Sequence, residues 1–167
     1  MYQTGDIILY GEHGVCRVAA VGPLKLGGMD GGVYYTLRPY YQPELVIYAP
    51  VEHPQVVVRP LLTRAEAEKV IEKLPQIPEL EISDEKSRET IYHQIQHGCD
   101  CLALAGMIKA LYRRRALRQK QGKHAASLDE RYFHSAEEQL YGELAYALGM
   151  DRKTTPDYIR LRLGQTE

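Results

Sequence analysis

The first 60 residues alternate between apolar and polar positions with a period of two. Short segments rich in β-branched and aromatic residues are separated by clusters of glycine, proline and aspartate, and they cover residues 6–10, 15–21, 33–37, 45–48 and 56–58. Successive side chains of a strand point to opposite faces of a sheet, so this pattern predicts five short strands. Their length and spacing favour an antiparallel barrel of the SH3-like or Tudor-like kind, because closing a sheet removes its unpaired edges.

Two glycine-containing segments are predicted to turn the chain between these strands. Residues 11–14 suit a tight turn, and the glycine-rich residues 27–32 suit a hairpin loop. Glycine accepts a positive φ without a Cβ clash, which such turns often require.

From residue 63 onward the apolar positions recur every three or four residues, which is the pattern of amphipathic helices. Five helices are predicted, and the residues expected to cap their N-termini are Thr63, Ser83, Asp100, Ser127 and Thr155. Glycines that suit the following C-termini are Gly98, Gly122, Gly149 and Gly164. The helix expected over residues 127–148 has the clearest apolar stripe, so it should lie at the centre of a bundle. We therefore expect two domains: a β domain over residues 1–60 and an all-α bundle of about five helices over residues 61–167.

The composition is that of an ordinary globular protein. The 167 residues are 44% hydrophobic and 26% charged, which argues against a disordered or collagen-like chain. No apolar run approaches the roughly 20 residues of a membrane span, and the N-terminus lacks a basic segment followed by an apolar one. Three cysteines fit a reducing compartment better than a disulfide framework. We therefore expect a cytoplasmic protein that has no contact with a membrane.

The net charge of -1 conceals one strongly basic block. The chain has 21 Lys and Arg against 22 Asp and Glu, yet residues 109–124 contain no acid and seven bases: Lys109, Arg113, Arg114, Arg115, Arg118, Lys120 and Lys123. Clustered cations release counterions when they meet phosphates, so the block predicts a nucleic-acid backbone site. The alternative is a solvated helix end whose cations favour the negative end of the helix dipole. No helix-turn-helix or zinc-finger pattern is present that would read bases.

One residue of the basic block has an additional requirement. Arg115 falls on the same helical face as the apolar Ile108 and Leu111. Either the helix has left the core by residue 115, or Arg115 has a carboxylate partner.

Four residues of zinc-ligand type lie within one short segment: His93, His97, Cys99 and Cys101. Zinc sites usually combine chelating pairs from two separate segments, whereas these four crowd around a single turn between helices. A zinc-binding or redox-sensing role is therefore only a third alternative. The chain has neither a Gly-Lys-Ser/Thr phosphate loop nor a G-x-S-x-G elbow. We expect no enzyme activity, no cofactor and no small-molecule substrate.

Several segments resemble the CarD/CdnL family of bacterial transcription regulators, and the divergent members found in Firmicutes are the most similar. In the N-terminal part the resemblance is carried by residues 5–15, 35–37, 49–52 and 59–61, and in the C-terminal part by residues 100–114 and 136–144. The resemblance implies a Tudor-like N-terminal domain, shared with the transcription-repair coupling factor, that docks on the β subunit of RNA polymerase. It also implies a helical C-terminal domain that contacts promoter DNA at the upstream edge of the transcription bubble and modulates the stability of the open complex.

The same resemblance implies which residues make these contacts. The polymerase-binding residues would be Lys25, Tyr35 and Tyr48. Together with the basic block, it implies DNA contacts by Arg88, Lys109, Arg113, Arg114, Arg118, Lys120 and Lys123. Better-known members insert a tryptophan into the minor groove, whereas this chain has no tryptophan and the matching position falls near Glu85. The main alternative is therefore a protein-only interaction module that keeps the barrel contact without a DNA wedge.

Overall fold

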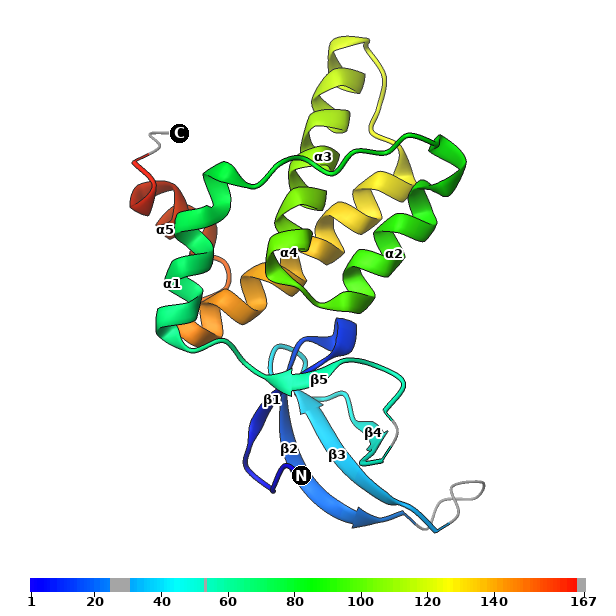
Figure 1. The fold of residues 1–167 in the computed structure, drawn as a ribbon, viewed down its shortest axis with the longest axis vertical. Helices are drawn as coiled ribbons and strands as arrows, with labels where there is room; N and C mark the ends of the chain where they lie inside the picture. Colours follow the sequence, from blue (N-terminus) through cyan, green and yellow to red (C-terminus); the bar gives the residue numbers. More distant parts are fainter. Residues whose placement is uncertain (25–30, 53, 165–167) are drawn as a thin grey trace. The chain divides into compact units, whose positions relative to one another are not determined.

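The computed structural model describes residues 1–24, 31–52 and 54–164, and Figure 1 shows the fold. The chain divides into two compact units, Met1–Leu61 and Leu62–Glu167. The sequence pattern placed the domain boundary between residues 60 and 61.

The first unit is a five-stranded antiparallel sheet with the strand order β4-β3-β2-β1-β5. Its strands are β1 (Ile7–Tyr10), β2 (Val15–Pro23), β3 (Val33–Pro39), β4 (Ile47–Pro50) and β5 (Val58–Pro60). All five predicted strands are present, each within a few residues of the expected bounds. A single 3-10 turn, η1 (Gly11–His13), joins β1 to β2 at the predicted tight turn. The hairpin loop predicted over residues 27–32 falls largely outside the described residues.

The core of this unit consists of the inward-facing side chains of the sheet. Ile8, Cys16, Val18, Leu37 and Ala49 are almost fully buried. A register shift between Val18 and Ala20 interrupts the β2–β3 ladder. Such a bulge increases the local twist of a strand, which helps a small sheet to wrap around its core.

The second unit contains five α-helices: α1 (Arg64–Lys73), α2 (Arg88–Gly98), α3 (Cys101–Lys120), α4 (Ser127–Leu148) and α5 (Thr155–Arg162). Two 3-10 turns, η2 (Leu74–Gln76) and η3 (Glu85–Ser87), lie between α1 and α2. The predicted layout of a β domain followed by a helical bundle is confirmed. Among the described ranges, no helix combines the length and apolar character needed to cross a bilayer.

Two predicted N-terminal caps are confirmed. The Thr63 hydroxyl accepts a hydrogen bond from the Glu66 amide, and the Glu66 carboxylate accepts one from the Thr63 amide, which completes a capping box. The Asp100 carboxylate accepts a hydrogen bond from the Ala103 amide at the start of α3. At the other end of a helix, Gly149 terminates α4 with a left-handed conformation, as predicted.

The other three N-terminal caps differ from the prediction: Ser87 precedes α2, Ala126 precedes α4 and Thr154 precedes α5. Asp84, and not Ser83, accepts a hydrogen bond from the Lys86 amide and begins the η3 turn. Helix α4 has Ala126 at its N-cap, so Ser127 already belongs to the helix. Helix α5 likewise includes Thr155 and begins after Thr154. A side chain can cap from neighbouring positions, and the tertiary position of the helix selects among them.

The left-handed residue after α2 is Cys99, with φ 58, and not the predicted Gly98. Only two residues separate α2 from α3, and Asp100 is in the extended conformation required of an N-cap. The reversal of the chain therefore falls on Cys99.

Helix α4 lies at the centre of the bundle, as its apolar stripe predicted. It packs most extensively against α3 and also contacts α1, α2 and α5. Its residues Ala136, Leu140 and Leu144 are almost completely buried, together with Tyr92 of α2 and Met107 of α3.

The segment of residues 74–82, here called the strap, links α1 to the turn before α2 and crosses α3 (Figure 1). The Leu80 amide donates a hydrogen bond of 3.1 Å to the carbonyl of Gly106. The ammonium group of Lys109 donates hydrogen bonds to the carbonyls of Leu74 and Ile77. The strap is thus held to α3 by polar contacts at Gly106 and at Lys109.

Candidate functional site

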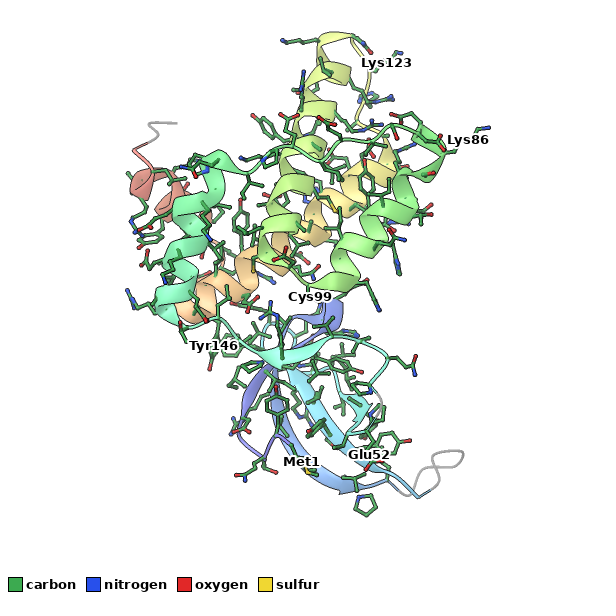
Figure 2. All side chains as sticks on the ribbon, viewed as in Figure 1. Met1, Glu52, Lys86, Cys99, Lys123 and Tyr146 are labelled. Carbon is green, nitrogen blue, oxygen red and sulfur yellow. The ribbon has the colours of Figure 1, made fainter. Side chains whose placement is uncertain are left out.

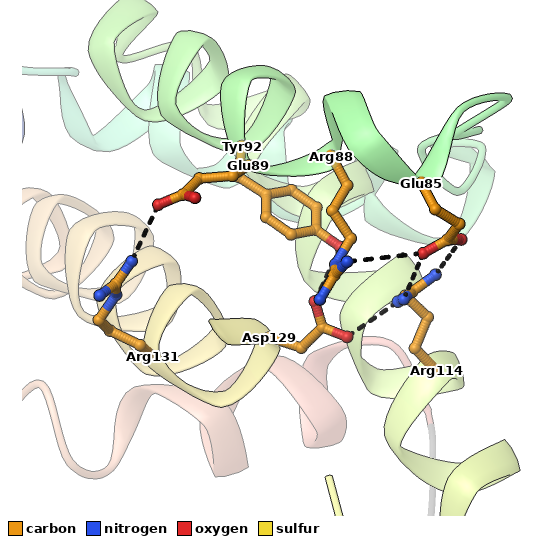
Figure 3. Close-up of polar contacts among 7 residues, drawn as sticks. All are labelled: Glu85, Arg88, Glu89, Tyr92, Arg114, Asp129 and Arg131. Carbon is orange, nitrogen blue, oxygen red and sulfur yellow. Dashed lines mark hydrogen bonds and ion pairs between the residues drawn. The ribbon is translucent and has the colours of Figure 1, made fainter. Parts of the chain in front are cut away.

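A buried carboxylate organises the end of the helical unit where α2, α3 and α4 meet (Figure 3). Asp129, in the first turn of α4, has a side chain that is only 6% exposed. Its two oxygens accept hydrogen bonds from Arg114 Nε at 2.9 Å, Arg88 Nε at 3.2 Å and the Tyr92 hydroxyl at 3.2 Å. Helix α2 therefore contributes two side chains to this contact, and α3 and α4 contribute one each.

Glu85 closes the network on its exposed side. Both of its oxygens accept hydrogen bonds from the two terminal nitrogens of Arg114, at 2.9 and 3.0 Å, and one lies 3.7 Å from Arg88 Nη1. Such a bidentate pair of a guanidinium with a carboxylate is among the strongest polar contacts in proteins. We call Glu85, Arg88, Tyr92, Arg114 and Asp129 the Asp129 network.

The pKa shifts in the Asp129 network follow from these contacts. Burial by itself raises the pKa of Asp129, but the hydrogen bonds and charges of Arg114 and Arg88 outweigh it, and the pKa is lowered. The hydrogen bonds from Arg114 lower the pKa of Glu85, and the pKa of Arg114 is raised mainly by Glu85. Burial raises the pKa of Tyr92 to about 12. The two arginines and two carboxylates therefore form a charged network whose charges cancel.

Three of the seven cations predicted to contact DNA are occupied inside the helical unit. Arg88 and Arg114 are partly buried in the Asp129 network, and Lys109 is partly buried against the strap. A guanidinium or ammonium group that already satisfies internal carboxylates or carbonyls has little left to offer a phosphate. These three residues hold the bundle together, and their contact with DNA stays a prediction.

Arg115 has the carboxylate partner that its position required. Its guanidinium lies 4.3 Å from the centre of the Phe133 ring and forms an ion pair of 3.5 Å with Glu130. Helix α3 therefore still packs against α4 at this point.

The remaining cations lie at the C-terminal end of α3. Lys120 and Lys123 are exposed and form no ion pair within the described part of the chain; Figure 2 shows Lys123 at this end of the unit. Arg118 Nε donates a hydrogen bond of 2.7 Å to the His124 carbonyl, which fixes the turn after α3. Arg113 is 66% exposed and pairs with Glu79, which is itself exposed. These four residues, called the α3 basic end, are the accessible part of the predicted basic block.

The four candidate zinc ligands divide into two exposed histidines and two buried cysteines. Across residues 1–24, 31–52 and 54–164, no group of three or more His, Cys, Asp or Glu side chains is arranged to hold a metal ion. His93 and His97 stack on each other along α2, whereas Cys99 and Cys101 are buried. The Cys101 thiol donates a hydrogen bond to the buried Glu143 carboxylate.

The three predicted polymerase-binding residues have different positions in the first unit. Lys25 lies outside the described residues. Tyr35 is only 5% exposed, and its hydroxyl accepts a hydrogen bond from the Tyr2 amide, so it belongs to the core and not to a docking surface. Tyr48 is 39% exposed on β4, which is an edge strand of the sheet. Of the two described residues, only Tyr48 is accessible to a partner.

The sequence pattern does not single out the two carboxylates of the Asp129 network. Asp129 and Glu85 look like ordinary members of solvated helix faces. The signal in the sequence is the excess of arginines on α3, since an arginine next to core positions requires a carboxylate, as at Arg115. Arg114 likewise needs a partner, and the structure supplies Asp129.

Residues 2–62 match the CarD-like/TRCF RID domain family. The matched segment includes all five strands of the sheet. No curated protein matches the chain significantly.

Proposed function

We propose, from the match of residues 2–62 to the CarD-like/TRCF RID domain family, that this chain is an RNA-polymerase-bound transcription factor that docks on the β subunit and touches promoter DNA. The first unit makes the polymerase contact, and the α3 basic end supplies non-specific contacts to phosphates. Because polymerase provides the position on the promoter, the factor needs no base readout of its own. Its contact with the DNA would modulate the stability of the open complex.

The proposed polymerase contact is supported by exposed apolar side chains in the unit that matches the CarD-like/TRCF RID domain family. Tyr40, Leu45 and Tyr48 are exposed, and they lie on edge strand β4 or in the segment that leads to it. Tyrosine is enriched among residues that dominate protein interfaces, since it combines a large apolar ring with a hydroxyl.

We expect Tyr48→Ala to weaken binding of the full-length protein to the isolated β lobe of RNA polymerase by about tenfold or more, as interface hot spots do. Leu161→Ala is the control, since Leu161 is an exposed apolar residue of the helical unit. Binding would be measured by biolayer interferometry. Equal affinity of Tyr48→Ala and the parent protein would remove Tyr48 from the interface, and no binding by the folded parent would overturn the polymerase contact itself.

The DNA contact is supported by the accessible cations of the α3 basic end. Each phosphate contact contributes about 0.9 to the slope of log affinity against log salt on duplex DNA. The double variant Lys120→Ala, Lys123→Ala should therefore reduce that slope by about 2. The matched control is Lys69→Ala, Lys73→Ala, which removes two exposed lysines from α1. An unchanged slope in the first variant would argue against phosphate contacts at this end of α3.

A protein-only interaction module is the second candidate, and Glu85 favours it. The resemblance places a DNA-wedging tryptophan near this position, whereas here a carboxylate pairs with Arg114 and Arg88. Phosphates repel such a carboxylate. The test compares the parent protein with the Lys120→Ala, Lys123→Ala variant. If both bind polymerase and both give the same lifetime of open complexes, the second function is favoured.

A further inference from the structure

The helical unit contains a groove between α3 and α4 that the polymerase contact does not use and that shares Arg113 with the α3 basic end. Its volume is about 720 Å³, within the range of about 300–1,000 Å³ typical of small-molecule sites. Glu79 of the strap and Arg160 of α5 complete its wall. All of its lining residues belong to the second unit.

The floor of the groove is aromatic and includes a stacked guanidinium. Phe133 is buried at its base, and Arg115 covers the Phe133 ring at 4.3 Å and lies 5.8 Å from the Tyr112 ring. Tyr112 is 62% exposed although it is a large aromatic residue in the middle of a helix. A planar ring that enters the groove therefore meets an aromatic face and a flat cation, which are the two surfaces on which nucleobases stack.

The rim of the groove carries exposed cations with weak partners. Arg113 pairs with the exposed Glu79, and Arg160 pairs with the exposed Asp157 of its own helix. Such surface pairs contribute little stability, so an anion of higher charge can replace the carboxylates. Guanidinium groups match the geometry of phosphate oxygens with two parallel hydrogen bonds.

Two acidic residues line the groove, Glu79 of the strap and Glu137 of α4. Burial raises the pKa of Glu137, while His134 and Arg115 act in the opposite direction and Glu130 adds to the increase. A carboxyl group in this position can accept a hydrogen bond from an amino group on a planar ring. A carboxylate at this position repels phosphate. The part of the groove near Glu137 therefore suits the ring, and the part near Arg113 and Arg160 suits the phosphates.

We propose that this groove binds a free nucleoside diphosphate or a mononucleotide of similar size. The base stacks against Tyr112 and Arg115, its amino group donates a hydrogen bond to Glu137, and the phosphates pair with Arg113 and Arg160. The site is assigned binding of the ligand and no reaction.

Isothermal titration of the full-length protein with ADP tests this site, with adenosine and pyrophosphate as half-ligands. ADP should bind at least about tenfold more tightly than either half. Tyr112→Ala and Arg160→Ala should each weaken ADP binding about tenfold, because stacking and a charge-assisted pair are lost separately. Leu117→Ala is the matched control for Tyr112→Ala, since Leu117 is also exposed on α3 but does not line the groove. Its affinity for ADP should equal that of the parent.

Several results would overturn the proposal. No heat of binding with ADP up to about 1 mM excludes a useful nucleotide site. Pyrophosphate that binds as tightly as ADP shows a simple anion site, and unchanged affinity in Tyr112→Ala removes the base from the groove. A single-stranded oligo(dA) that binds in a Tyr112-dependent manner, when ADP neither binds nor competes, makes the occupant a nucleic acid and not a free nucleotide.

Discussion

Replacement of Asp129 by asparagine is expected to lower the free energy of unfolding of the helical unit by about 3 kcal/mol. The substitution preserves the shape of the side chain but leaves the partly buried Arg88 and Arg114 without their shared counter-charge. Loss of one partner from a buried ion pair costs about 3–5 kcal/mol, and the lower value applies because Glu85 still holds Arg114.

Urea unfolding followed by far-ultraviolet circular dichroism measures this loss. The control is Asp157→Asn, which removes an exposed carboxylate that pairs with Arg160 on the same helix, and its effect should stay below about 0.5 kcal/mol. If both variants lose the same small amount, the Asp129 network does not hold the bundle together.

The same network makes the stability of the helical unit sensitive to acid. Because the folded pKa of Asp129 lies below its ordinary value of 3.8, its contribution is present above that value and is lost as the pH falls through the folded pKa. The stability difference between the parent protein and Asp129→Asn should therefore shrink as the pH falls below about 4. A difference that stays constant into strong acid would contradict the assignment.

Gly106→Ala is expected to destabilise the helical unit by about 1–3 kcal/mol, although alanine is the better helix former. A Cβ atom at residue 106 would lie 2.9 Å from the carbonyl oxygen of Pro78 in the strap. That oxygen belongs to the backbone, so the strap itself must move. Its displacement also disturbs the hydrogen bond from the Leu80 amide to the Gly106 carbonyl.

Gly98→Ala is the matched control for this prediction. Gly98 is also helical, but a Cβ atom there would meet nothing within 4 Å, so the substitution should be neutral or stabilise by up to about 1 kcal/mol. Thermal unfolding of both variants, combined with hydrogen exchange at the Leu80 amide, separates strap displacement from a general change in stability. Gly106→Ala that is as stable as Gly98→Ala would show that the strap is not held close to α3.

The elements were largely predictable because they depend on local patterns. Period-two alternation located all five strands, and the stripe of Leu140 and Leu144 placed α4 at the centre of the bundle. The errors lie at element ends, where Asp84 replaced Ser83 and Cys99 replaced Gly98. Neighbouring residues can both serve as caps, and the path that the chain must take to the next helix selects one of them.

The candidate site was less predictable, because charge in a sequence does not show which charges are paired. The sequence shows the basic block of residues 109–124 but not its partners. Lys109 binds the Ile77 carbonyl, 32 residues away in the sequence, and Arg114 binds Asp129, 15 residues away. Tyr35 was assigned to a docking surface although its side chain points into the sheet core.

The sequence alone determines the two-part organisation and the helix and strand content of this protein. It also determines the resemblance of the N-terminal part to the CarD-like family. All of these features depend on residues that are close together in the chain. Tertiary structure alone decided which cations face solvent. A guanidinium such as that of Arg114 is neutralised by whichever carboxylates the packing of helices brings within about 3 Å, and ion-pair energy falls with distance in space and not with separation in sequence. The basic block is therefore reduced to the α3 basic end, and the other cations hold the bundle together or line the groove.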